Sequence, residues 1–362
     1  MAETEAGLYS VNVDKMVNML SKAYINLINA GVPFKKFPSV MLWGPPGVGK
    51  SQGIREIAKC IEQSTNRRVV ITDVRLLLFN PVDLRGIPTA NEDKTLAVWL
   101  KPKIFQMDDS EQTVNILFLD EISAAPPSVQ AAAYQMTLDR TVGEHRLPEN
   151  CIVIAAGNRV TDKSVAYNMP KALANRLCHF DIQGEADSWH DWAVKSGIHP
   201  YVSGYIEYNS VALMRFDSSA ASLAFPTPRS WELVSNILNF VSSDIDEVYP
   251  MIIGCIGHAA AASFKVWTEL YKALPSVEEI CESKEVAVPK SPELRIALRS
   301  DMVAYARKHP ESSAVDALIS FACRLPWSFR GKLLHDFCQI SELRSAVEQN
   351  EVFKTAVEKG FK

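Results

Sequence analysis

The sequence predicts an α/β fold in which a parallel five-stranded sheet, interrupted by inserted hairpins, is followed by a helical region. Short apolar runs recur along the first half of the chain, with helical stretches between several of them, as in a parallel sheet with right-handed crossovers. After about residue 184 the strand pattern fades and helical spacing dominates. The five predicted strands are Val40–Trp43, Val69–Val74, Val114–Leu119, Cys151–Ala156 and Cys178–Ile182.

Before the first strand, residues 11–30 have the apolar spacing of one helix. Immediately after that strand comes a glycine-rich segment that fits the phosphate-loop pattern of Gly, four residues and Gly-Lys-Ser. It consists of Gly44, Pro45, Pro46, Gly47, Val48, Gly49, Lys50 and Ser51. Residues 52–61 continue with helical spacing, so backbone N–H groups and a helix dipole should converge on one spot.

We therefore expect these eight residues to bind ATP, with Lys50 on the β- and γ-phosphates and the Ser51 hydroxyl on Mg²⁺. The alternative is a chance glycine-rich loop, which the flanking strand and helix disfavour.

The third strand ends in two carboxylates, Asp120 and Glu121. Its continuous apolar character predicts a strand covered on both faces, with its carboxyl end at the ligand edge of the sheet. Asp120 should hold Mg²⁺, which prefers oxygen ligands, and Glu121 should polarise the attacking water. The alternative is a surface pair that caps a helix starting near Ser123, whose first turn would include Pro126 and Pro127.

The fourth strand ends in Gly157-Asn158-Arg159. An asparagine there can lie between Glu121 and the γ-phosphate and position the water, although Gly-Asn is also an ordinary turn pair. Its place after the other two motifs favours a polar sensor of the γ-phosphate.

Two hairpins are predicted between the strands. One is an insert at about residues 80–103, and the smaller one, at about 139–148, precedes the Asn158 strand. We expect an α/β core over residues 1–183, a helical lid over 184–280 and a helical extension over 281–362, with the linker within 282–290. Thr227 and Pro228 should begin one lid helix as N-cap and first residue.

The composition, 47% apolar and 22% charged with a net charge of −4, is that of a globular protein without a polybasic tail. Seven cysteines, without Cys-x-x-Cys spacing, indicate free thiols rather than disulfides or a zinc site. We expect a cytoplasmic protein, because the N-terminus lacks the pattern of a secretion signal. No membrane insertion is expected, since no apolar stretch approaches the roughly 20 residues of a bilayer span.

In their order along the chain, these motifs resemble those of the AAA+ ATPases, and within them the MoxR-like group. The narrower resemblance involves Asp83–Pro88, at the start of that group's helix-2 insert, and the hairpin over residues 139–148. It also involves Ala155–Arg159 and Leu173–Leu177, although Asn175 and Leu177 stand where the group usually has Asp and Phe.

The resemblance implies a homo-oligomeric ring, usually a hexamer, with ATP between neighbouring subunits. Arg176 would then reach the next subunit's γ-phosphate, and Arg229, at a lid-helix start, would be the second sensor. The alternative role of Arg176 is a salt bridge, and the alternative for Arg229 is an ordinary position on the helix surface. Arg146 or Arg159 could replace either residue in its role.

MoxR-like ATPases typically remodel partners that carry a von Willebrand factor A domain, which here would be a separate protein. The insert, with Ile87, Leu96, Val98 and Trp99, would face the ring axis and contact a client, unless Trp99 only anchors the hairpin. Two rival functions are a nucleic-acid motor, which the acidic charge disfavours, and an assembly scaffold with negligible turnover, which Glu121 disfavours.

Overall fold

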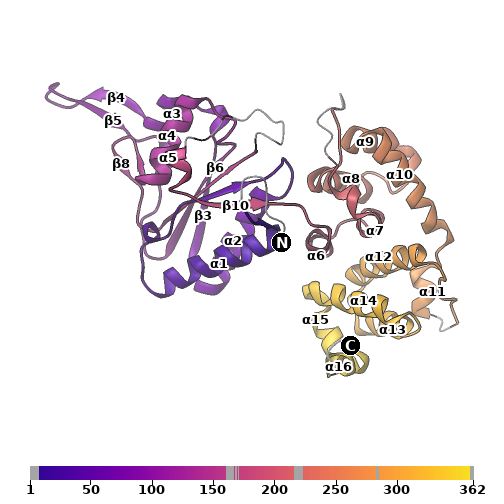
Figure 1. Ribbon diagram of the computed structural model, residues 1–362. Coiled ribbons are helices and arrows are strands. Elements are labelled where there is room, and N and C mark those ends of the chain that lie inside the picture. Colours follow the sequence, from indigo (N-terminus) through magenta and orange to yellow (C-terminus); the bar gives the residue numbers. More distant parts are fainter. Residues whose placement is uncertain are drawn as a thin grey trace. The chain divides into compact units, whose positions relative to one another are not determined.

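The computed structural model divides into two compact units, Met1–Gln183 and Gly184–Lys362 (Figure 1). It describes residues 8–159, 167, 169, 171–215, 223–282 and 285–358. The sequence predicts an α/β core over residues 1–183 and two helical parts over residues 184–280 and 281–362.

The first unit is built on a six-stranded sheet in the order β1-β10-β2-β9-β6-β3, and every pairing in it is parallel. Its strands are β1 (Ser10–Val11), β2 (Val40–Trp43), β3 (Arg68–Arg75), β6 (Thr113–Asp120), β9 (Cys151–Gly157) and β10 (Cys178–Ile182). All five predicted strands form, and the α/β class is confirmed. The strand count of five is wrong by one, because two-residue β1 is too short to carry a periodic pattern.

Helices cover both faces of this sheet. α1 (Val13–Asn29) and α2 (Lys50–Thr65) pack on one face, and α4 (Pro127–Leu138) packs on the other (Figure 1). Within β6 the side chains alternate between these layers: Ile116 and Phe118 join the α1/α2 core, whereas Leu117 joins the α4 core. Burial on both faces explains why the strands have continuous apolar runs instead of alternating ones.

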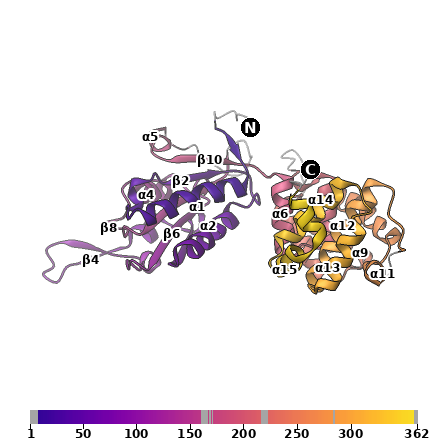
Figure 2. The same ribbon diagram turned by 90° about the horizontal axis from the view of Figure 1, so that it is seen from below.

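Both hairpins form in the first unit. The insert begins with the short helix α3 (Pro81–Arg85) and continues as β4 (Ile87–Ala90) and β5 (Ala97–Leu100), which project from the rest of the unit (Figure 2). Gly86 is needed at its base, because a Cβ there would lie 1.9 Å from the Leu100 carbonyl oxygen. The smaller hairpin consists of β7 (Thr141–Val142) and β8 (His145–Arg146). A four-residue helix, α5 (Lys171–Ala174), precedes β10.

The described part of the second unit is helical. Its first helices are α6 (Ala186–Ser196), α7 (Pro200–Tyr208), α8 (Pro228–Phe240), α9 (Ile245–Ile256) and α10 (His258–Thr268). The remaining helices are α11 (Val277–Glu282), α12 (Pro292–Lys308), α13 (Ser312–Ala322), α14 (Trp327–Gln339), α15 (Arg344–Gln349) and α16 (Glu351–Glu358). α8 starts as predicted, with Thr227 as N-cap and Pro228 as its first residue.

Two apolar cores divide this helical unit. One centres on α7–α10, with Trp231 and Phe264 fully buried, and the other gathers α12–α15. Val277 and Ile280 of α11 pack into the second core. The expected linker therefore connects α11 to α12 inside this unit, and residues 283 and 284 of it lie outside the described residues. Among the helices that the structure describes, none has both the length and the apolar character to cross a bilayer.

Asp301 on α12 is a partly buried carboxylate whose ionisation opposes folding. Burial raises its pKa from 3.8 to about 6; Glu278 adds to the increase, and Lys308 opposes it. Because the folded state holds this proton more tightly than the unfolded state does, the stability contributed by protonated Asp301 is lost as the pH rises from about 4 to about 6.

We predict that Asp301→Asn raises the free energy of unfolding above pH 6 by up to about 3 kcal/mol, which corresponds to a pKa shift of about two units. The gain should shrink as the pH falls towards 4, where wild-type Asp301 is also uncharged. Urea denaturation at pH 4.5 and pH 7.5 measures both values, with Glu232→Gln on the exposed surface of α8 as the control. A gain that is equal at both pH values would contradict this explanation.

Candidate functional site

Three neighbouring strands of the sheet end at one edge, and each is followed by a polar motif. β9 lies between β2 and β6, with Trp43 opposite Gly157 and Leu119 opposite Ala155. Since the strands are parallel, the phosphate loop after β2, Asn158 after β9 and Asp120–Glu121 at the end of β6 share the same edge. The sheet thus brings together the three motifs that lie far apart in the sequence.

The phosphate loop has the backbone geometry of an anion cradle. Gly47 and Gly49 have φ angles of 76° and 105°, in the left-handed region that glycine adopts without strain. Gly49 is the N-cap of α2 and has no side chain with which to cap the helix. No N-cap side chain therefore competes with a phosphate at the first turn of α2, where the N–H groups and the helix dipole favour negative charge.

Lys50 connects this loop to Asn158. Its buried Nζ donates to the carbonyl oxygens of Gly44 at 2.6 Å and Pro45 at 3.1 Å, and to Asn158 Oδ1 at 3.2 Å. A buried ammonium group needs such oxygen partners, because burying a charge without them costs several kcal/mol by usual estimates. The ammonium is thus held within the cradle, where a triphosphate would be its counter-charge.

Ser51 and Asp120 form the oxygen pair expected for Mg²⁺. The Ser51 hydroxyl donates to Asp120 Oδ2 at 3.3 Å, and the Glu121 N–H donates to Asp120 Oδ1 at 2.9 Å. Burial raises the pKa of Asp120, while the Glu121 N–H and Lys50 oppose that increase. A hydroxyl and a carboxylate beside a phosphate cradle suit Mg²⁺, which takes hard oxygen ligands and retains several waters.

Glu121 has the left-handed backbone conformation that is uncommon for residues other than glycine, with φ of 57°. Such conformations occur often at functional sites. The helix-cap alternative for the Asp120–Glu121 pair does not hold, because α4 begins at Pro127 and its N-cap is Pro126. Residues 123–125 form a turn before the helix, so the expected helix start near Ser123 is wrong by about one turn.

Ser123 also belongs to this site, although no motif of the sequence points to a role for it there. Its buried hydroxyl accepts a hydrogen bond from the Asn158 N–H at 2.9 Å. Gly157 has to be glycine beside it, because a Cβ would lie 2.7 Å from the Ser123 Oγ. The backbone of Asn158 is therefore fixed from the β6 side while its side chain contacts Lys50. Only the pairing of β6 with β9 reveals this contact.

The predicted arginines lie in different places. Arg176 is exposed two residues before β10, whose first residue, Cys178, pairs with Val40. It therefore lies at the amino-end edge of the sheet, opposite the phosphate loop of its own chain. Arg146 is exposed on β8, and Arg159 forms an ion pair with buried Asp181. Arg229 is exposed on α8, in the second unit.

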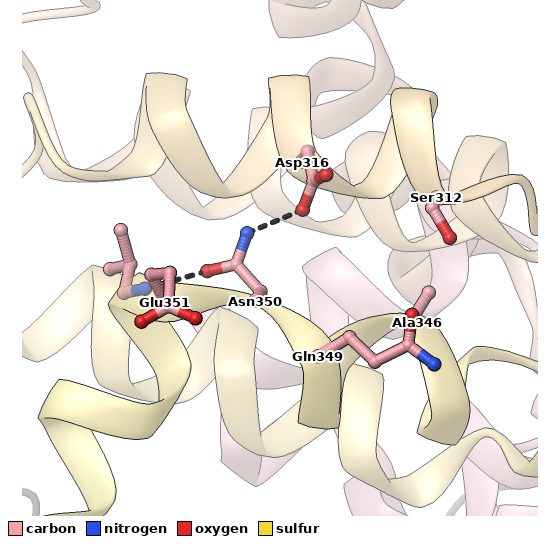
Figure 3. A pocket seen from close by; sticks show the side chains of 7 residues that line it. Ser312, Asp316, Ala346, Gln349, Asn350 and Glu351 are labelled. Carbon is pink, nitrogen blue, oxygen red and sulfur yellow. Dashed lines mark hydrogen bonds between the residues drawn. The ribbon is translucent and has the colours of Figure 1, made fainter.

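A pocket of about 380 Å³ lies in the second unit between α13 and the α15–α16 region (Figure 3). Its lining consists of Ser312, Asp316, Ala346, Gln349, Asn350, Glu351 and Val352. The Asn350 side chain donates to Asp316 at 2.5 Å and accepts from the Val352 N–H at 2.9 Å. These polar groups thus hold the start of α16, and the chemistry expected from the sequence motifs lies in the other unit.

Comparison with known protein families finds a match within the first unit. Residues 39–179 match the ATPase family associated with various cellular activities (AAA). The matched segment contains the phosphate loop, Asp120, Glu121, Asn158 and Arg176. No curated protein sequence matches the chain.

Solved structures with a similar arrangement have low identity to this chain. NtrX from Brucella abortus in complex with ATP is 16% identical, with 98% of this chain and 69% of that chain covered and a TM-score of 0.37. Its complex with ADP is 17% identical, with 85% and 64% covered and a TM-score of 0.36. A RuvB mutant from Thermotoga maritima is 12% identical, with 96% and 87% covered and a TM-score of 0.35.

Proposed function

We propose that this protein is a Mg²⁺-dependent AAA+ ATPase of the MoxR-like type, which assembles as a ring and remodels a separate partner protein. The observation that carries the ATPase proposal is the convergence of Lys50, the Asp120–Glu121 pair and Asn158 on one phosphate cradle. The family match over residues 39–179 supports the same conclusion.

In this proposal each residue has one task. Lys50 and the N–H groups of the loop bind the phosphates, and Ser51 and Asp120 hold Mg²⁺, which neutralises phosphate charge when bound. Glu121 orients the attacking water and accepts its proton. Asn158 holds the water against the γ-phosphate from the neighbouring strand end. Only the last two tasks act mainly in the transition state.

The ring, for which we propose six subunits, is supported by the position of Arg176. This exposed guanidinium lies at the edge opposite its own phosphate loop, so it can complete a site only in a neighbouring molecule. Arg159 fits this role less well, because its ion pair with Asp181 would have to break. Arg229 stays the proposed second sensor, and a cytoplasmic location remains a prediction.

The insert hairpin supports the remodelling part of the proposal. Ile87, Leu96 and Leu100 are 64%, 67% and 58% exposed, whereas Trp99 is half-buried and its carbonyl oxygen lies 2.8 Å from His145 Nε2. Trp99 thus helps to anchor the hairpin, and the other apolar side chains are free to contact a client. We propose a protein client, with a von Willebrand factor A-domain protein as the partner. Exposed Glu92 and Asp93 at the hairpin tip disfavour nucleic acid.

We predict that Lys50→Ala weakens ATP binding about a hundredfold, the equivalent of about 3 kcal/mol, since it removes a ground-state contact with the phosphates. Glu121→Gln should bind ATP as wild type does, yet lose about 10²–10⁴-fold in kcat, because it removes a proton acceptor. Calorimetry and steady-state hydrolysis separate the two effects, with exposed Glu144→Gln as the control. Near wild-type turnover by Glu121→Gln would refute the catalytic assignment.

Removal of Arg176 should leave nucleotide binding intact and lower hydrolysis by about a hundredfold or more, as expected for an arginine supplied in trans. Mixing Arg176→Ala with Lys50→Ala should restore part of the activity, because some interfaces then pair an intact cradle with an intact arginine. Arg146→Ala, on another exposed arginine of the same unit, is the matched variant. If mixing restores nothing in rings that exchange subunits, Arg176 does not act in trans.

We predict that the triple variant Ile87→Ser, Leu96→Ser and Leu100→Ser no longer captures the partner. Its basal ATP hydrolysis should stay within about twofold of wild type, because all three side chains are largely exposed. The partner is captured in ATP on the Glu121→Gln background, with and without the three substitutions. Val266→Ser removes an equally exposed apolar side chain from α10 and serves as the control. Undiminished capture together with reduced hydrolysis would make the hairpin a structural element.

A further inference from the structure

The residue after Asn158 has a buried partner. Arg159 forms an ion pair with Asp181 of β10, in which the Asp181 side chain is 1% exposed and that of Arg159 is 26% exposed. Asp181 also accepts hydrogen bonds from Ser10 Oγ at 2.7 Å and Gln183 Nε2 at 3.4 Å. The carboxylate is thus tied to β1, to the end of β10 and to the end of β9.

This ion pair crosses the strand that leads into the phosphate loop. In the sheet, Asp181 lies opposite Trp43, and Trp43 lies opposite Gly157, so β2 separates the two partners' strands. Two strand spacings amount to about 10 Å, a distance that a long arginine and an aspartate can bridge together. Gly44, which follows Trp43, packs so closely that a Cβ on it would lie 2.6 Å from the Ile182 carbonyl oxygen. The bridge therefore lies beside the base of the loop.

Asn158 is consequently held on three sides. The Ser123 hydroxyl accepts a hydrogen bond from its N–H, Lys50 contacts its side chain, and Arg159, the next residue, is bound to Asp181 of β10. A displacement of about 1 Å at a group that orients a reactant can cost about a hundredfold in rate. An anchor at the end of β9 can therefore affect hydrolysis without touching the nucleotide.

We propose that Arg159 is a positioning residue for Asn158, and that its ion pair with Asp181 sets the geometry of the γ-phosphate sensor. This inference rests on the proposed ATPase function. It explains why a charged pair is kept at a place where burial makes ion pairs weak contributors to stability. A purely structural pair would affect folding, nucleotide affinity and turnover together, whereas a positioning pair affects turnover alone.

The test compares the wild type with Arg159→Gln/Asp181→Asn, which removes both charges and leaves no buried charge unpaired, and with Arg159→Lys, which keeps the positive charge. The matched control is Lys35→Gln/Glu149→Gln, which removes an exposed ion pair of 2.6 Å in the same unit. For each protein, affinity for a fluorescent ATP analogue, kcat and the thermal midpoint of unfolding are measured.

We expect the neutral double variant to lose tenfold or more in kcat while its nucleotide affinity stays within threefold of wild type, and Arg159→Lys to recover part of the rate. The double variant should lose no more kcat than either single variant, Arg159→Gln or Asp181→Asn. A wild-type kcat in the folded double variant would overturn the inference, as would a parallel fall in affinity, kcat and thermal midpoint. If the wild type binds no ATP analogue and does not hydrolyse ATP, the proposed function itself fails.

Discussion

The parallel register of β2, β9 and β6 is the constraint on which the candidate site depends. Because these strands run in the same direction and lie side by side, the phosphate loop, Asn158 and Asp120 end at one edge within reach of each other. The hydrogen bond from Lys50 Nζ to Asn158 Oδ1 joins residues 108 positions apart and exists only in this register. A strand that ran the other way would carry its polar end to the opposite edge of the sheet.

Charge at this edge is arranged before any phosphate enters. The Lys50 ammonium lies among neutral carbonyl and amide oxygens, and the Asp120 carboxylate is held by a hydroxyl and a backbone N–H. Lys50 also acts on Asp120 electrostatically, since it opposes the increase of the carboxyl pKa that burial causes. Preorganised groups of this kind need little rearrangement when charge develops, which is why such sites favour the transition state.

The distribution of residues over the first unit agrees with the proposed ring. The residues proposed to bind and hydrolyse ATP gather at one edge of the sheet, while exposed Arg176 lies at the other. The insert hairpin adds exposed apolar side chains that the α/β core does not need for its own packing. Buried Asp181 lies two residues before the last residue of the first unit, so its ion pair with Arg159 links the end of β9 to β10, the strand that leads into the helical unit.

From the amino-acid sequence alone one can predict the fold class, the five main strands, both hairpins and the candidate residues of the phosphate loop, Asp120, Glu121 and Asn158. This is possible because glycine spacing, apolar runs and paired carboxylates are local patterns. Only the tertiary structure reveals four further features: strand β1, the turn between Glu121 and α4, the hydrogen bond to the Ser123 hydroxyl, and the Arg159–Asp181 ion pair. Ser123 is separated from Asn158 by 35 residues and Ser10 from Asp181 by 171, so only strand pairing can bring them together. A hydrogen bond or ion pair across strands leaves no periodic trace in either segment.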